Sequence, residues 1–559
     1  MSGVFVGIFL EYINLMILIL TRTYDELLTN IEFDDLLNDA KLQNMDPKVR
    51  NMIIDQVEKD LDRVLPSLSE NVYGFGKQLA RLANLAKILC NFQGVDDETN
   101  RSNADGDTVV REDRHSKLDV LASKAADLLY GYLSKFLDDG NSDNLVYDSN
   151  FGGIVTRDGL YNSEADFGNG WYNDHHFHYG YILYASAIMA NINTTFVDDY
   201  APNINSILFD VAHNGNQNSE QVQGSFFPFT RHKAWFDGHS YASGLFPFGD
   251  GKSQESSSEA VNCYYGAYLW SLAYATSTGD GIKQQAMDQI NFMKLLLAME
   301  IRSTKTYWHI HPSSTGIMAG VDSRPSYSPS FEKALMIGNL GMMDATIRTW
   351  FGIEPLYVHM INFLPVTAIT KELFDPAYVR IEFDQVIRPI YHDVEMAWKG
   401  YVIADKAMLD PTSSWHDATQ VRSYELDSAL SQSQLYYWIS TMDGFTTPSS
   451  DDIPKNSQLE GNIASDLVDA SCLSNEACTN QGLAGNCCPT DDGSFLGCCN
   501  NASSISVAKN ETSTSESFDN ATNVKDASSC ASRSACTSMG LTGQCCPTGD
   551  GIMLGCCDA

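Results

Sequence analysis

The feature that most constrains the fold is the helical spacing of apolar residues along most of the chain between Leu27 and about Thr447. Leucines recur every three or four positions at Leu79, Leu82, Leu85 and Leu89, which is the period of one face of an α-helix. The same spacing predicts helices at Lys48–Val64, Gln78–Leu89, Leu118–Leu137, Tyr181–Ala190, Val261–Tyr274, Ala286–Met299, Ala334–Trp350 and Leu430–Met442. Alternating strand patterns are scarce, so we expect a mainly α fold and not a parallel α/β sheet.

Two long segments between the predicted helices, Val146–Tyr181 and Ser225–Glu259, are rich in glycine, aspartate, asparagine and aromatic residues. Many helices joined by long loops are typical of a helical barrel or toroid whose loops build one cleft. We therefore look for the functional site in these two loops.

Each loop concentrates side chains that carry chemistry. Asp166–Tyr181 contains two aspartates, three histidines and four tyrosine or tryptophan residues just before a predicted helix. The second loop ends with Glu255 and Glu259, which would share one face if this segment were helical. Paired carboxylates among aromatic and histidine residues indicate a glycosidase-like site.

Simpler interpretations of these residues exist. The three histidines within His175–His178 could hold a metal with Asp174, or Asp174 could merely cap the following helix. Glu255 and Glu259 could form a solvated helix face, and single aromatic residues more often belong to a core. None of these alternatives explains why such residues gather in only two loops.

Several long motifs together resemble one known family. They are NGWYNDHHFHYGY, RHKAWFDGHSYASGLFPF and SQESSSEAVNCYYG in the loops, with GFGKQLARLANLAKIL, GGIVTRDGL, MIGNLGMMDATIRTWFG and INFLPVTAIT elsewhere. Over about residues 65–445 the chain resembles glycoside hydrolase family 81, the endo-β-1,3-glucanases. The resemblance implies an (α/α)6 barrel with an open cleft, and hydrolysis of internal β-1,3-glucosidic bonds with inversion at the anomeric carbon.

The resemblance also implies roles for individual residues. Asp174 matches the general acid and Glu259 the general base, with Glu255 as a supporting carboxylate. Inversion places the acid and the base about 6.5–9.5 Å apart, and an acid near neutrality requires a raised pKa. For contacts with sugar hydroxyls and for stacking we select Tyr172, His178, Asp237, His239 and Trp235.

Cysteines mark a separate C-terminal region, where 12 of the 14 form two copies of the pattern C-x5-C-x8-CC-x9-CC, beginning at Cys472 and Cys530. Segments this short cannot bury a core that outweighs their chain entropy, so we expect three disulfides in each copy. Zinc is the alternative, which vicinal cysteines without histidine fit poorly. The modules could bind polysaccharide or serve only as a protease-resistant tail. Cys90 and Cys263 are expected to be free, buried thiols.

Disulfides together with sequons predict a secreted or cell-wall glycoprotein; three sequons, at Asn501, Asn510 and Asn520, lie between the modules. The apolar run Val4–Leu20 has no basic residue before it and no small-residue cleavage site, so it is not a clean signal peptide. We expect it to be a buried helix or the product of a mispredicted start. The resemblance also implies a large β-sandwich ahead of the barrel, but only about 65 helix-like residues precede Pro66. We expect either that this sequence starts late or that the sandwich is dispensable.

The resulting domain prediction has six parts. They are an N-terminal helical remnant or linker at 1–65, the barrel at 66–447, a linker at 448–470, a Cys-rich module at 471–500, a Ser/Thr/Asn-rich linker at 501–528 and a second module at 529–559.

The net charge of the chain limits the classes of molecule that it can bind. With 36 basic and 71 acidic residues the formal charge is −35, which repels nucleic acid and anionic membranes and disfavours a lyase acting on an anionic polymer. The expected partner is a neutral β-1,3-glucan, laminarin-like or callose-like. We expect the enzyme to be a monomer without cofactor or metal. The competing hypothesis is a catalytically impaired glucan-binding protein of the cell wall or surface.

Overall fold

The computed structural model describes residues 40–63, 66–67, 71–102, 112–138, 145–215, 226–247, 251–277, 283–312 and 327–447. The chain divides into two compact units, Met1–Ala464 and Ser465–Ala559. The Cys-rich modules, the sequons between them and the run Val4–Leu20 lie outside the described residues. None of the helices in the described ranges has the length and apolar character needed to cross a membrane.

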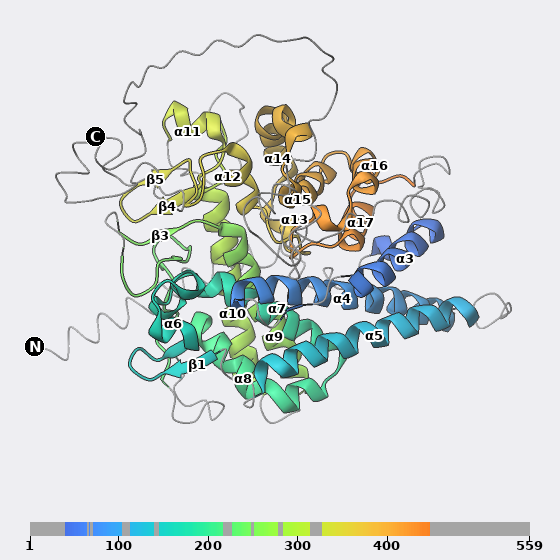
Figure 1. The fold of residues 1–559 in the computed structure, drawn as a ribbon, viewed down its shortest axis with the longest axis horizontal. Helices are drawn as coiled ribbons and strands as arrows, with labels where there is room; N and C mark the ends of the chain where they lie inside the picture. Colours follow the sequence, from blue (N-terminus) through green and yellow to red (C-terminus); the bar gives the residue numbers. More distant parts are fainter. Residues whose placement is uncertain are drawn as a thin grey trace, which may run out of the picture. The chain divides into compact units, whose positions relative to one another are not determined.

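The described part of the first unit is mainly helical, as Figure 1 shows. Its α-helices are α2 (Ala40–Gln43), α3 (Pro47–Arg63), α4 (Val72–Ser102), α5 (Glu112–Leu137), α6 (Arg157–Tyr161), α7 (His175–Ile192), α8 (Thr195–Ala212), α9 (Ser257–Ser277), α10 (Lys283–Tyr307), α11 (Pro329–Ala334), α12 (Pro355–Ile361), α13 (Thr370–Leu373), α14 (Pro376–Glu382), α15 (Met396–Ala407), α16 (Pro411–Gln420) and α17 (Gln432–Ser440). This confirms the prediction of a mainly helical fold.

Strands are few and short in the described ranges, and all are antiparallel. They are β1 (Leu145–Asp148) and β2 (Gly153–Thr156), which form a hairpin, and β3 (Ser253–Gln254), β4 (Asn339–Gly341) and β5 (Ala345–Thr346), which form a three-stranded sheet in the order β3-β4-β5. Leu145 pairs with Thr156, and Ser253 pairs with Gly341. The loop predicted at Val146–Tyr181 therefore contains a hairpin and the first turns of α7.

Most of the predicted helices are confirmed, but the helix predicted at Ala334–Trp350 is wrong. That segment begins at the last residue of α11 and then forms the strands β4 and β5. A Cβ atom at Gly338 would lie 2.4 Å from the carbonyl oxygen of Arg348, so this tight approach requires glycine. The apolar pattern of this segment is too short to distinguish a helix from a strand, and its glycines favour the turn between β4 and β5.

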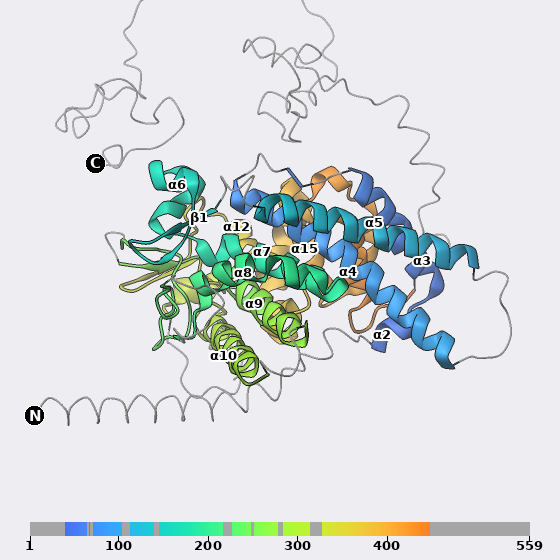
Figure 2. The ribbon, with the colours of Figure 1, turned by 90° about the horizontal axis from the view of Figure 1, so that it is seen from below.

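The helices pack as a series of neighbours in which α5 contacts α4, α4 contacts α7, α7 contacts α9, and α9 contacts α10 (Figure 2). Helix α15 contacts α16 and α17, and α17 contacts both α3 and α4. Residues of α3 and α4 also share one hydrophobic core. The domain boundary predicted at residue 65 therefore falls between two helices of the same packed unit.

Helices α7 and α9 approach each other closely because glycines face the contact. A Cβ at Gly180 would lie 2.8 Å from the Cα of Cys263, and a Cβ at Gly266 would lie 2.8 Å from the backbone nitrogen of Tyr184. Because Gly180 meets Cys263 and Tyr184 meets Gly266, residue numbers rise together along both helices. The two helices run parallel, and their N-terminal ends lie side by side.

Candidate active site

Asp174 lies at the residue that precedes α7, held in an unusual conformation. Its backbone has φ 58° and ψ 13°, in the left-handed region that costs a residue with a Cβ about 1 kcal/mol or more. Its N–H donates to the carbonyl oxygen of Ala242 at 2.9 Å. The carboxyl makes no hydrogen bond to the helix, so the simple capping interpretation is wrong.

The Asp174 side chain is buried, and its Oδ1 atom has no hydrogen-bond partner. Burial raises the pKa of this carboxyl well above its ordinary value of 3.8, and the nearby carboxylates of Glu255 and Glu259 raise it further. All three causes favour the protonated form.

Glu259 occupies the first turn of α9 and is also buried, but it is well satisfied. Its Oε1 accepts hydrogen bonds from the hydroxyls of Tyr181 at 2.7 Å and Tyr73 at 3.0 Å. Burial raises the pKa of Glu259 above its ordinary value, and these hydrogen bonds and the charge of Lys77 offset only part of that rise. Donors directed at one oxygen favour the ionised form.

Lys77 belongs to a polar network behind Glu259. Its Nζ lies 2.8 Å from Oδ2 of Asp427 and 5.2 Å from the centre of the Tyr73 ring. The Tyr401 hydroxyl donates to the other oxygen of Asp427 at 2.7 Å. The network thus places a cation near Tyr73 and Glu259 while its own charge is matched by Asp427.

Glu255 lies before α9 rather than within it, so the expectation that Glu255 and Glu259 share one helix face is wrong. Both side chains are buried, which also excludes the solvated helix face. Oε1 of Glu255 accepts a hydrogen bond from the backbone N–H of Trp350 at 2.5 Å. Burial raises its pKa to about 7 against the lowering effect of that hydrogen bond, and Glu259 adds to the rise.

A small apolar cluster joins the two loops predicted to carry the site. It consists of Phe177 in the first turn of α7, Ala242 in the second loop and Ala260, which follows Glu259. Together with the parallel packing of α7 and α9, this cluster brings the segments of the three carboxylates to the same end of the helix pair. Glu255 and Glu259 both raise the pKa of Asp174, and Glu259 also raises that of Glu255, which is consistent with their proximity.

The residues selected for sugar contacts have different positions. Tyr172 is fully buried: its hydroxyl donates to Asp148 at 3.0 Å and its ring lies 4.1 Å from the guanidinium carbon of Arg231. Its hydroxyl and its ring thus already have partners within the protein, and its role as a sugar contact remains a prediction. His178 lies beside the ring of Tyr73, with centroids 5.0 Å apart, and burial lowers its pKa to about 3.

Trp235, Asp237 and His239 lie in the second loop. The Trp235 ring stacks on Phe229, with centroids 5.2 Å apart and planes at 10°, so one of its faces is already covered. His239 is buried, and its Nδ1 lies 3.0 Å from the carbonyl oxygen of Ser240. Asp237 is half-buried. Their role as substrate contacts remains a prediction.

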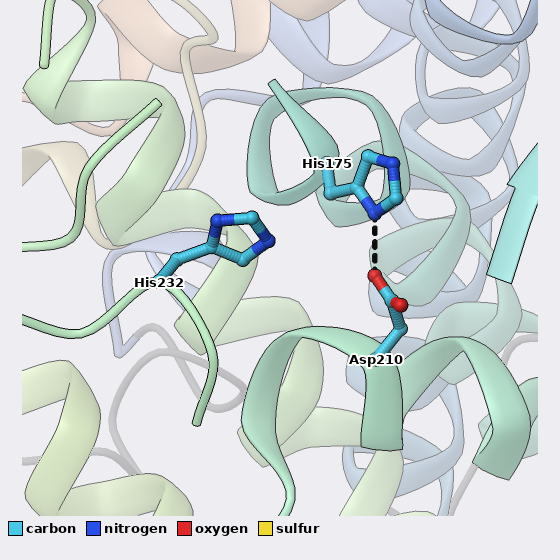
Figure 3. Close-up of side chains that lie close together, drawn as sticks. All are labelled: His175, Asp210 and His232. Atoms are coloured by element: carbon cyan, nitrogen blue, oxygen red, sulfur yellow. Dashed lines mark hydrogen bonds and ion pairs between the residues drawn. The ribbon is translucent and has the colours of Figure 1, made fainter. Parts of the chain in front are cut away.

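The histidines of the first loop do not converge on Asp174 as the metal alternative requires. His175 instead lies 2.6 Å from Asp210, and together with His232 these residues form the one group with metal-ligand spacing among the described residues (Figure 3). His176 contacts Gln254 at 3.2 Å.

Sequence reasoning missed several residues around the carboxylates. Tyr73 and Lys77 come from α4, and Trp350 from the segment after β5, far from the two loops in sequence. Tyr181 was within the first loop but carried no distinguishing signal. Trp171 and Trp350 are 41% and 46% exposed. Their exposure marks them as candidates for stacking on a sugar, but the sequence alone does not reveal it.

The helical fold and the buried carboxylates together indicate a glycosyl hydrolase domain. Comparisons with known proteins confirm this class. The family model described as "Glycosyl hydrolase family 81 C-terminal domain" matches residues 42–439. The chain belongs to glycosyl hydrolase family 81, which confirms the resemblance.

Relatives and a solved structure agree with this assignment. The chain is 31% identical over 280 residues to a glucan endo-1,3-beta-D-glucosidase 2 of Saccharomyces cerevisiae, covering 48% of this chain and 32% of the relative. It is 28% identical over 285 residues to a primary septum glucan endo-1,3-beta-D-glucosidase of Schizosaccharomyces pombe, covering 50% of this chain and 25% of the relative. The chain thus spans about a third or less of these relatives. A family 81 structure from Clostridium thermocellum has a TM-score of 0.51 at 22% identity, covering 73% of this chain and 50% of the other.

Proposed function

We propose that this chain is an endo-hydrolase of β-1,3-glucans that cleaves internal β-1,3-glucosidic bonds with inversion. The observation that carries the proposal is the contrast between two buried carboxyls at the adjacent N-terminal ends of α7 and α9. Asp174 has an unpartnered Oδ1 and a pKa raised by burial and by two carboxylates. Glu259 accepts two tyrosine hydroxyls. Two carboxyls whose environments separate their pKa values are suited to an acid and a base.

Asp174 is the proposed general acid. A protonated carboxyl donates its proton to the glycosidic oxygen as the bond to the anomeric carbon breaks. The absence of a partner for Oδ1 supports this role, because a carboxyl bound tightly to donors would stay ionised. Its left-handed backbone and its N–H bond to Ala242 fix the direction in which the side chain leaves the chain.

Glu259 is the proposed general base, which accepts a proton from the water that attacks the opposite face of the sugar ring. Both tyrosines donate to Oε1, so we assign Oε2 to the water. Attack opposite the leaving group inverts the anomeric carbon in one step. Glu255, with a pKa raised to about 7, is proposed to keep the pKa of Asp174 high and to orient the water.

Substrate contact is proposed to come from exposed aromatic residues of the same loops. Trp171 precedes Asp174 by three residues, and the N–H of Trp350 bonds to Glu255. Their partly exposed rings are better placed for stacking on sugar than Trp235. A net charge of −35 suits a neutral polymer, laminarin-like or callose-like. The relatives named above are glucan endo-1,3-beta-D-glucosidases, which supports the same bond.

The wider organisation is part of the proposal. The series of packed helices is proposed to close as an (α/α)6 barrel, followed by a linker at 448–470 and the modules at 471–500 and 529–559. A secreted or cell-wall location is proposed on the basis of the cysteine pattern and the sequons. A monomeric state is proposed as well.

The test uses the full chain with soluble β-1,3-glucan. We expect new reducing ends, short oligosaccharides from internal cleavage, and the α-anomer as the first product detected by proton NMR. The β-anomer first would overturn inversion while leaving hydrolysis intact. Retention of glucan in an affinity gel without any product would replace the enzyme by the glucan-binding alternative.

A further inference from the structure

A second buried polar cluster includes the first residue of α7. It joins three segments: His175 from α7, Asp210 from α8 and His232 from the 226–247 loop (Figure 3). One possible ligand atom from each lies within 4.8 Å of the others, and all three side chains are buried, with exposures of 0%, 0% and 2%. None of the three is one of the carboxylates proposed for hydrolysis.

His175 has a fixed orientation and a fixed tautomer. Its Nε2 lies 2.8 Å from the carbonyl oxygen of Asn169, which can only accept, so the hydrogen is on Nε2. In the neutral ring, Nδ1 then carries a lone pair, and it lies 2.6 Å from Oδ2 of Asp210. Two lone pairs at that distance repel, so a proton is shared between the two atoms in this conformation. A metal ion, whose bonds to nitrogen and oxygen are each about 2.0–2.2 Å long, can take the place of that proton once the two atoms move apart.

Asp210 is oriented as well, because its Oδ1 accepts a hydrogen bond from the N–H of Ile154 at 2.9 Å. His175 and Asp210 thus each have a backbone partner on the far side, an arrangement that is common among protein metal ligands, where it holds the histidine tautomer and the carboxylate in place.

His232 distinguishes between the two cations. Both of its ring nitrogens are buried and have no hydrogen-bond partner. A proton shared by His175 and Asp210 leaves both nitrogens of His232 unsatisfied, which is unfavourable for buried polar atoms. A metal ion bound by all three residues uses one of these nitrogens.

The chain contains an internal comparison. His359 has the same arrangement, with Nε2 2.9 Å from the carbonyl oxygen of Ala334 and Nδ1 2.5 Å from Oε1 of Glu382. Among the described residues this pair belongs to no group of three with metal-ligand spacing. A proton is enough for such a pair. The His359 pair has the buried carboxyl of Asp405 near Glu382, whereas the His175 pair has the unpartnered imidazole of His232 beside it.

We propose that His175, Asp210 and His232 bind a divalent transition-metal cation of the zinc class, which joins α7, α8 and the 226–247 loop. Two imidazole nitrogens and one carboxylate oxygen are a donor set that zinc accepts. Binding requires the proton between His175 and Asp210 to leave as the metal enters, so affinity falls as pH falls. Arg231 and Lys252 carry positive charge close to His232 and weaken binding. Because the cluster is buried, the ion is structural.

The experiment measures zinc binding to the full chain after treatment with a chelator and desalting. We expect calorimetric titration with zinc to show about one site that is absent from His232→Phe and from Asp210→Asn. We also expect zinc to raise the melting temperature of the natural chain and not of these variants. The matched control is His309→Phe, which replaces another buried, ring-stacked histidine outside the cluster and keeps the site.

Cobalt supplies a site-specific readout, because the C-terminal cysteines could also bind metal. Cobalt bound by the proposed residues gives visible ligand-field bands without the thiolate charge-transfer band of a cysteine site. Undiminished binding by His232→Phe, a spectrum with thiolate bands only, or no binding by the natural chain would each overturn the proposal. None of these outcomes depends on glucan hydrolysis.

Discussion

Asp174 and His175 are neighbours in the chain, yet they enter two buried clusters with opposite electrostatics. Asp174 lies near two further carboxylates, and burial and repulsion together raise its pKa. His175 lies against Asp210, where Nδ1 of the imidazole faces a carboxylate oxygen at 2.6 Å. Burial alone therefore does not decide whether a polar group serves stability or reactivity.

The carboxyls of the two clusters also differ in how well they are hydrogen-bonded. Asp174 keeps an unpartnered oxygen, whereas both oxygens of Asp210 have partners, and in that second cluster it is His232 that lacks them. A proposed reacting group must remain available to substrate, while a structural group is stabilised by full hydrogen bonding. Substitutions in the first cluster should affect activity, and substitutions in the second should affect folding.

The largest expected effect follows Asp174→Asn. Loss of the acid should lower kcat/KM on β-1,3-glucan by about 10²–10⁴-fold, measured by reducing ends. Because the folded pKa is raised, the folded state holds a proton that the unfolded state releases, and Asp174 lowers the free energy of unfolding as pH rises above its ordinary pKa. We therefore expect the variant to be at least as stable as the natural chain at pH 7. Full activity, or marked destabilisation, would contradict the assignment.

Asp210→Ala should produce the opposite result. It leaves His175 and the N–H of Ile154 without their partner, so the free energy of unfolding should fall by about 3–5 kcal/mol. Denaturant unfolding with chelator present measures this loss without any metal. Asp210→Asn is the matched control, because its amide can donate to Nδ1 of His175 and should recover part of the loss. An alanine variant as stable as the natural chain would remove the distinction between the clusters.

A smaller effect is expected for Tyr181→Phe, which removes one donor to Glu259 and raises the pKa of that carboxyl. The base must be ionised, so activity should be lost at a higher pH on acidification, with the acid limb of kcat/KM moving up by about one to two pH units. Tyr184→Phe is the control, because its hydroxyl lies one turn further along α7 and bonds to Asn84 instead. An acid limb that moves equally in both variants would refute a specific effect on Glu259.

The smallest expected effect is that of Glu255→Gln on the alkaline limb. Glu255 has a pKa of about 7, so above that pH its charge raises the pKa of Asp174. Without this charge Asp174 should lose its proton at a lower pH, and the alkaline limb of kcat/KM should shift downward. A limb that stays in place would show that burial alone raises the pKa of Asp174.

Periodicity predicted the long helices well because α3, α4, α5 and α9 each bury a face that spans several turns. It failed at Ala334–Trp350, where close backbone contact at Gly338 outweighs a short apolar pattern. Helix α8 went unpredicted, and Pro202 interrupts its sequence pattern.

The loop chemistry identified Asp174, Glu255 and Glu259 because unusual residues gathered there. The tyrosine and lysine partners of Glu259 could not be found in the same way. Tyr73 lies 186 residues before Glu259, and only the packing of α4 on α7 brings its hydroxyl to that carboxylate. Such a tertiary contact leaves no local pattern in the sequence.

The parallel packing of α7 and α9 has an electrostatic consequence. Peptide dipoles aligned along a helix give its N-terminal end about half a positive charge. Because Gly180 and Gly266 let the two helices run side by side in the same direction, both positive ends face the segments of Asp174 and Glu259. The two helix ends together thus contribute about one positive elementary charge. This charge offsets part of the electrostatic repulsion among the three carboxylates without any additional lysine or arginine side chain.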